Sequence, residues 1–135
     1  MTTRVFFLER VNDHLQYFKH INHTLENDEC FQKNSKEDDC FRGTSDTECN
    51  LGRWLYGEGS VEISALANSQ IEALFRSLFE PHTHFHTLSK EAIYKRQAGN
   101  KEGARAMIVE MKETSNLLTS KMLELETLLQ KEGFV

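Results

Sequence analysis

Apolar residues along this chain recur at steps of three and four residues, and no segment alternates between apolar and polar residues. An α-helix completes a turn about every 3.6 residues, so this spacing places the apolar side chains on one face of each helix. A half-buried strand would show a period of two instead. The periodicity therefore predicts an all-α fold.

The first predicted helix spans about residues 3–25. Its expected apolar stripe consists of Val5 or Phe6, Leu8, Val11, Leu15, Phe18, Ile21 and Leu25. Residues 26–48 follow, which are polar and acidic and have little periodicity. They predict a long connection, with a short helical turn near Cys30 and Phe31.

A short helix is expected over about residues 49–57. Three residues that favour N-cap positions precede it, namely Ser45, Asp46 and Thr47. Gly57 or Gly59 is expected to close this helix in a left-handed conformation. The short helix thus begins at Cys49.

Two more long helices complete the pattern. One runs from about residue 61 to 78 and meets Pro81, which lacks a backbone N–H and should kink the helix or start a new one. Helical spacing resumes after Pro81 with Phe85, Leu88, Ala92 and Tyr94, and it fades at Gly99 and Asn100. The last covers about residues 101–131. Together these segments predict one domain over residues 1–135, an antiparallel four-helix-bundle-like fold with an extra short helix that carries Cys49.

Composition narrows the function classes. Sixteen basic and 21 acidic residues give a formal charge of −5, which argues against a nucleic-acid partner. The apolar run of residues 5–8 is too short for a signal peptide or a membrane span, so we expect a cytoplasmic protein. The cysteines, Cys30, Cys40 and Cys49, form an odd set without compact disulfide spacing. In a reducing compartment each is a buried small residue, a reactive thiol or a metal ligand.

Two histidines have the spacing of a metal-ligand pair. His82 and His86 are four residues apart on a predicted helix, so both imidazoles lie on one face and can reach one ion. Such a pair also occurs often by chance. His84 lies between them and points to the other side of the helix, which leaves it out of the predicted site.

Cys49 and His14 add two further candidate ligands. Cys49 opens the short helix, where the helix dipole and free backbone N–H groups favour a thiolate. His14 lies three residues after Val11 and faces inward with the apolar stripe, whereas His20 and His23 flank that stripe and are expected at the surface.

Three inward imidazoles and one thiolate would complete a closed tetrahedral shell, and Zn²⁺ suits this mixed nitrogen and sulfur set best. The predicted ligands are His14, Cys49, His82 and His86. Since they come from three helices, zinc would tie the bundle together.

The run Cys49-Asn50-Leu51-Gly52-Arg53-Trp54 resembles the Cys-x-Phe/Leu-Gly-x-Trp signature of the chemoreceptor zinc-binding domain family. That family also has a histidine in its first helix and a later His-x-x-x-His, and this chain has His14, Cys49, His82 and His86 in the same order. The family often carries Trp three residues after the first histidine, where this chain has Tyr17. Cys30 and Cys40 lie outside the family pattern.

The resemblance implies a cytoplasmic zinc-binding sensory domain of bacterial signal transduction. Similar domains are attached to chemoreceptors or diguanylate cyclases, tend to form homodimers, and are linked to sensing zinc or hypochlorous acid through the zinc-bound cysteine. The start at Met1 favours a stand-alone member over a fragment. What the domain senses stays open at this point.

Three other interpretations remain. A zinc hydrolase needs an open coordination position and a general base, and neither is expected here, so we predict that the chain is not an enzyme. A di-iron bundle needs several inward carboxylates, commonly Glu-x-x-His, a motif that this chain lacks. A purely structural zinc module that does not sense anything is the third.

Overall fold

The computed structural model describes residues 4–32 and 40–134. The helices within these ranges are α1 (Arg4–Glu26), the 3₁₀ turn η1 (Asp28–Phe31), α2 (Asn50–Tyr56), α3 (Glu58–Ala65), α4 (Ser69–Arg76), α5 (Phe79–Gln97) and α6 (Lys101–Lys131). Over the same ranges there is no strand, which confirms the all-α prediction. None of these helices combines the length and apolar character needed to cross a membrane.

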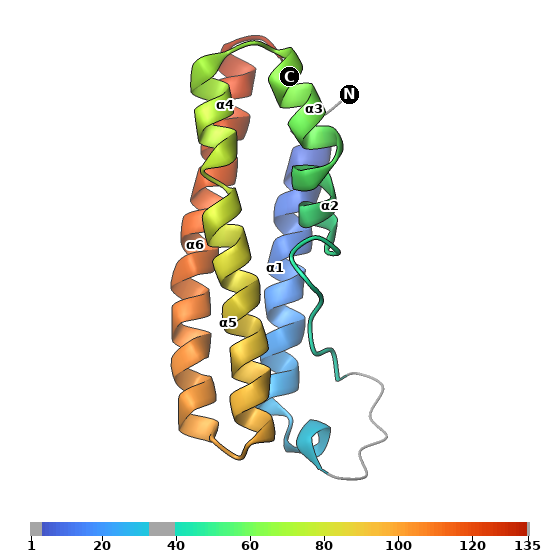
Figure 1. The fold of residues 1–135 in the computed structure, drawn as a ribbon, viewed down its shortest axis with the longest axis vertical. Helices are drawn as coiled ribbons and strands as arrows, with labels where there is room; N and C mark the ends of the chain where they lie inside the picture. Colours follow the sequence, from blue (N-terminus) through green and yellow to red (C-terminus); the bar gives the residue numbers. More distant parts are fainter. Residues whose placement is uncertain (1–3, 33–39, 135) are drawn as a thin grey trace.

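The helices form an elongated antiparallel bundle (Figure 1). α1 runs down one side, and the short helices α2 and α3 return upward beside its upper half. α4 and α5 then descend one after the other, and α6 ascends along both of them. The bundle-like fold with an extra short helix after Cys49 is therefore confirmed.

Two apolar clusters fill the interior. One is built on α1 to α4 and α6, and consists of Phe7, Val11, Leu51, Trp54, Leu55, Ile63, Ile71, Phe75, Leu78, Leu118, Met122, Leu125 and Leu129. The other joins α1, α5 and α6, and consists of Tyr17, Ile21, Leu25, Phe85, Leu88, Ala92, Ile93 and Met111. Cys49 packs against both clusters, so it lies at their junction.

The buried face of α1 differs in part from the predicted stripe. Leu8 and Leu15 are 43% and 45% exposed, whereas Phe7 and Tyr17 are buried. Both sets of residues have helical spacing, so periodicity alone does not distinguish them. The packing of α2, α5 and α6 around α1 selects the face that contains Phe7 and Tyr17.

The predicted continuous helix over residues 61–78 is wrong. The chain forms α3 and α4, separated at Ala67, whose φ of 52° is left-handed. Asn68 then caps α4, because its side-chain oxygen accepts hydrogen bonds from the N–H groups of Gln70 and Ile71.

A new helix begins near Pro81, which is one of the two outcomes that the sequence predicted. α5 begins at Phe79, so Pro81 lies in its first turn, where a backbone N–H would have no partner within the helix. The predicted left-handed cap after α2 is wrong, however. Gly57 caps α2 with a φ of −117°, and α3 begins at the next residue.

The expectation that the cysteine spacing allows no compact disulfide is also wrong, because Cys30 and Cys40 are bonded to each other. η1 places Cys30 so that its Cα lies 5.6 Å from that of Cys40. Such a distance suits a disulfide, and it depends on the path of the chain rather than on the spacing in sequence.

Ala67 gives a test of the break between α3 and α4. Ala67→Gly should raise the free energy of unfolding by about 0.5–1 kcal/mol, because glycine adopts a left-handed φ without the Cβ penalty. Ala73→Gly, at an exposed position inside α4, should instead lower it by about 1 kcal/mol. Urea unfolding measures both, and a lower stability of Ala67→Gly would contradict the strain assigned to Ala67.

Candidate metal centre

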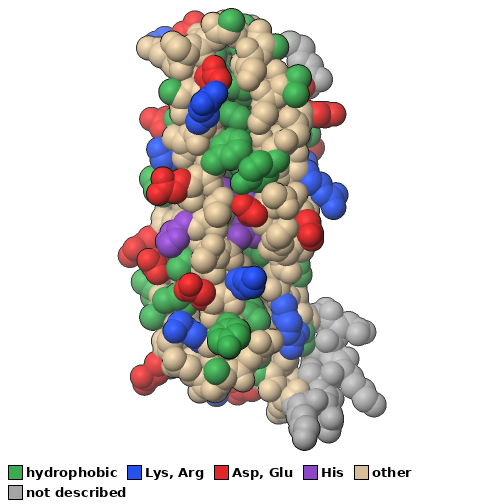
Figure 2. Space-filling model, viewed as in Figure 1, with side chains coloured by type: hydrophobic (Ala, Val, Ile, Leu, Met, Phe, Trp, Pro, Cys, Tyr) green, Lys and Arg blue, Asp and Glu red, His purple; other side chains and the backbone are tan. Residues whose placement is uncertain are grey.

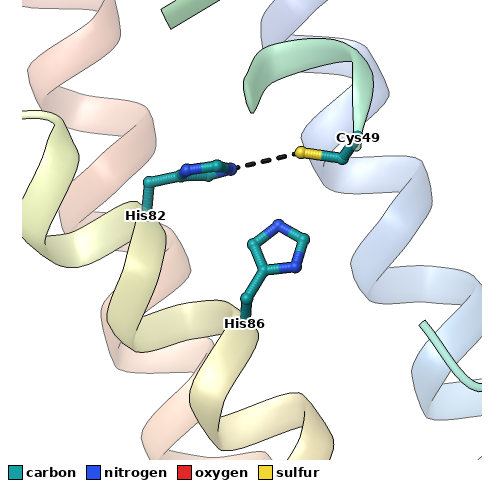
Figure 3. Close-up of side chains that lie close together, drawn as sticks. All are labelled: Cys49, His82 and His86. Carbon is teal, nitrogen blue, oxygen red and sulfur yellow. Dashed lines mark hydrogen bonds between the residues drawn. The ribbon is translucent and has the colours of Figure 1, made fainter. Parts of the chain in front are cut away.

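Three side chains converge where α2 begins beside α5. The Cys49 Sγ and one ring nitrogen each of His82 and His86 all lie within 4.8 Å of one another. Figure 3 shows the three side chains pointing toward one another, with Cys49 Sγ 3.2 Å from Nε2 of His82. Three of the four predicted ligands are thus brought together.

A backbone carbonyl orients the His86 ring. Nδ1 of His86 lies 3.0 Å from the carbonyl oxygen of Thr44. Since a carbonyl oxygen can only accept, Nδ1 carries the proton and Nε2 keeps a free lone pair. A hydrogen bond of this kind is typical of metal-binding histidines, where it fixes both tautomer and ring orientation.

His14 lies beside this cluster but outside the group of three. It is 4% exposed, as its inward position predicted, and it lines the same pocket as Cys49 and His86. Its Nε2 lies 2.9 Å from the hydroxyl of Ser115 on α6. While that hydrogen bond holds Nε2, Nδ1 is the ring nitrogen left to bind a metal. The assignment of His14 as the fourth ligand stays a prediction.

The remaining histidines are exposed, as expected. His20 and His23 lie on the outer side of α1, and His84 faces away from its two neighbours toward Glu110. On the face of the molecule drawn in Figure 2, histidine atoms are visible at mid-height. Position on the helix therefore separated the three buried imidazoles from the exposed ones.

Burial keeps the imidazoles neutral. Burial, with the nearby His86 and His14, lowers the pKa of His82 to about 3, and burial with the nearby His86 lowers the pKa of His14 to about 4. Burial also lowers the pKa of His86, although the Thr44 carbonyl opposes that shift. Neutral imidazoles with free lone pairs are the form that binds metal.

Cys49 is both the thiol of the cluster and the N-cap of α2. Its Sγ accepts a hydrogen bond from the Gly52 N–H at 3.2 Å, so the prediction that Ser45, Asp46 or Thr47 caps this helix is wrong. Burial raises the pKa of the Cys49 thiol, while the backbone donor at Gly52 lowers it. A bound divalent cation would favour the thiolate strongly.

The donor set fits zinc. One thiolate and several neutral imidazoles are ligands that zinc takes in closed tetrahedral sites. Zinc bond lengths place a sulfur and a nitrogen ligand about 3.6 Å apart, close to the observed 3.2 Å between Cys49 and His82. Nδ1 of His82 is buried and has no hydrogen-bond partner among the described residues. The donor types of the cluster and the spacing between Cys49 Sγ and Nε2 of His82 thus fit a zinc ion.

Comparison with known families agrees with this chemistry. A model described as the chemoreceptor zinc-binding domain matches residues 14–93, which is more than half of the chain. The chain belongs to this family. Comparisons with curated proteins and with solved structures gave no match. All four predicted ligands lie within the matched residues.

In this chemoreceptor zinc-binding domain, the glycine and the tryptophan of the Cys49–Trp54 motif each have a structural reason. A Cβ at Gly52 would lie 1.7 Å from the Asp46 carbonyl oxygen, so only glycine allows the turn before α2 to approach so closely. The Trp54 ring is buried edge-on against Phe7 and Phe75, which anchors α2 to α1 and α4.

Sequence reasoning missed three residues that support the ligands. Thr44 orients His86, Ser115 bonds to His14, and the Asp46 carboxylate lies near the cluster. Burial raises the pKa of Asp46, but the hydroxyl donors Thr83 and Tyr56 outweigh it and hold that pKa below its usual value. Ser115 could have been found from the sequence, because a polar residue on the apolar face of the last helix implies a buried hydrogen-bond partner.

Gly52→Ala tests the close approach before α2. The new methyl group must displace the Asp46 carbonyl, so we expect a loss of about 2–4 kcal/mol in the free energy of unfolding and weaker metal binding. Asn50→Ala changes an exposed residue of the same helix and should leave both within about 0.5 kcal/mol. Calorimetry on both variants measures unfolding and metal binding. A Gly52→Ala variant with unchanged stability would contradict the close approach of the Asp46 carbonyl to Gly52.

The buried histidines predict acid sensitivity of the metal-free domain. The pKa values of His14 and His82, about 4 and 3, lie below their ordinary value of 6.5. Near pH 5 the unfolded chain therefore binds more protons, so stability falls as pH drops below about 6.5. Each histidine contributes about 1.4 kcal/mol per pH unit there.

Urea unfolding of metal-free protein between pH 7 and pH 5 measures this dependence. His82→Asn should remove the contribution of one proton from the slope. His84→Asn, an exposed position on the same helix, should leave the slope unchanged. Equal slopes for wild type and His82→Asn would contradict the neutral buried state of His82.

Proposed function

We propose that this domain binds one zinc ion through Cys49, His82 and His86, with His14 as the fourth ligand. The observation that carries the proposal is the convergence of the three ligand atoms within 4.8 Å. We further propose that the domain is a cytoplasmic sensory module of bacterial signalling and has no enzymatic activity of its own. Four protein ligands would close the shell that a zinc enzyme must keep open.

The proposed signal is hypochlorous acid. Zinc, when bound, would hold the Cys49 sulfur as a thiolate. The thiolate then attacks hypochlorous acid: sulfur loses two electrons and gains OH, and chlorine leaves as chloride. The product is a sulfenic acid at Cys49, a reversible oxidation state.

Two features support Cys49 as the reacting group: its sulfur is accessible to a small oxidant, and its oxidation would disturb α2. It is half-buried, and it lines a pocket of about 300 Å³ that a small oxidant can enter. The same sulfur caps α2, so oxidation changes a ligand and a helix cap in one step. α2 contacts α1, and a shift of α2 would thus reach the surface of the bundle.

We propose that the shift is read across a homodimer interface or by a chemoreceptor or diguanylate cyclase partner. Apolar side chains remain exposed on α1 and α6, namely Val5, Leu8, Leu15, Val109, Leu117 and Leu123. A groove of about 700 Å³ between these two helices is lined in part by Leu15 and Val109. Exposed apolar surface of this kind is typical of association sites.

Metal analysis of protein purified without added metal tests the site. We expect about one zinc per chain, lost in Cys49→Ala and His82→Ala because three ligands hold zinc far more weakly than four. His84→Ala is the matched control and should keep its zinc, while His14→Ala decides the fourth ligand. Full zinc in Cys49→Ala would refute the ligand set, and two metal ions per chain would favour a di-iron centre.

Titration of the zinc-loaded protein with hypochlorous acid separates the sensing alternatives. An oxidant sensor should release zinc as Cys49 becomes a sulfenic acid, trapped with a cyclic diketone, and should change its dimer state or helix content. A direct zinc sensor should show the same change on zinc removal alone. A structural module should respond to neither and should lose zinc slowly to a strong chelator.

A further inference from the structure

The Cys30–Cys40 disulfide lies at one end of a segment that leads directly to the metal site. Residues 40–48, here named the strap, run from this disulfide to Cys49 and contain no helix. Figure 1 shows the strap beside α1, below α2. The disulfide joins the start of the strap covalently to a buried residue, since Cys30 is 0% exposed.

The middle of the strap lies against the cluster. The Thr44 carbonyl accepts hydrogen bonds from Nδ1 of His86 at 3.0 Å and from the Tyr17 hydroxyl at 3.2 Å. The Thr44 N–H donates to the same Tyr17 hydroxyl at 3.0 Å. Phe41 packs edge-on against the Tyr17 ring. The strap therefore positions the Thr44 oxygen that fixes the His86 ring.

The strap can approach this closely only because Gly43 has no side chain. Its φ is +90°, and a Cβ there would lie 2.6 Å from the Tyr17 hydroxyl oxygen. Arg42 donates hydrogen bonds to the carbonyls of both Cys30 and Cys40, but its own side chain is largely exposed. The polar contacts at the start of the strap are therefore weak without the covalent bond.

We propose that Cys30 and Cys40 form a thiol–disulfide switch that sets how firmly the strap holds the metal site. The inference rests on the proposed zinc function, which it extends by a second redox input. Disulfides in reducing compartments are uncommon and are usually redox-active, which fits the proposed location of the domain.

The switching reaction is exchange with a dithiol reductant. One thiolate of the reductant attacks Sγ of the half-buried Cys40, and Cys30 leaves as a thiolate. The second thiol of the reductant then displaces Cys40 and closes its own disulfide. Two electrons and two protons pass to the cysteine pair, and an oxidised dithiol reverses the reaction.

Reduction frees the strap from Cys30, so its opening becomes easier and Thr44 leaves His86 more often. Cys49, the next residue after the strap, then becomes more accessible. We expect Cys49 to react with iodoacetamide about tenfold faster in the reduced state, and zinc release to a chelator to accelerate similarly.

The test compares oxidised wild type with the double variant Cys30→Ser, Cys40→Ser, both as full chains. The chain has three cysteines, so Cys49 is the one free thiol in either protein and alkylation reports on it alone. Alkylation is measured on metal-free protein, and zinc release on the zinc-loaded form. Circular dichroism checks that the bundle is intact.

Phe41→Ala provides a second route that leaves both cysteines in place. It removes the ring contact with Tyr17 and should raise the alkylation rate even when the disulfide is closed. If the double variant fails to fold, wild type reduced with a phosphine and Phe41→Ala still decide the question. Because reduction also frees Cys30 and Cys40, alkylation of the peptide that contains Cys49 is then followed separately by mass spectrometry.

Equal alkylation rates in the oxidised and reduced states would overturn the switch, as would failure of an oxidised dithiol to close the disulfide. If both states still hold one zinc with equal release rates, the zinc site stands and only the coupling fails. If neither state binds zinc, the proposed function fails, while the alkylation of metal-free Cys49 still decides the coupling.

Discussion

The structure depends on a layer of polar side chains buried between two apolar clusters. His14, His82 and His86 are each at most 7% exposed, and Cys49 lies at the junction of the clusters. Polar groups in such a position must find hydrogen-bond partners or an ion, because burial without either costs free energy. Hydrogen bonds satisfy part of this layer, and a metal ion would stabilise the rest.

This requirement explains why so many features meet at Cys49. Its sulfur caps α2 and lies close to His82. It is also the ligand of the cluster that must lose a proton before it binds a metal. Gly52 and Trp54 then act around it: the first lets the preceding turn approach, and the second holds α2 in the apolar cluster. A short helix of seven residues would be marginal alone, so tertiary contacts must fix it.

The same layer links distant parts of the chain. The strap reaches it through Thr44, α6 through Ser115, and α1 through His14. A change in any one of these contacts alters the surroundings of the others, because the interior is closely packed and has little room to adjust. A small chemical change at one sulfur can in this way become a change in how the helices pack.

The sequence by itself determined the helical class, the limits of α6, an interruption of the helical pattern near Pro81 and the order of the four candidate ligands. These follow from local periodicity, backbone chemistry and motif spacing. Only the tertiary structure decided which face of α1 is buried, the break at Ala67, the disulfide between Cys30 and Cys40, and the capping of α2 by Cys49 itself. It also decided that His14 bonds to Ser115 while the other three groups converge. Each of these depends on which segments pack together in space, and residue spacing along the chain does not contain that information.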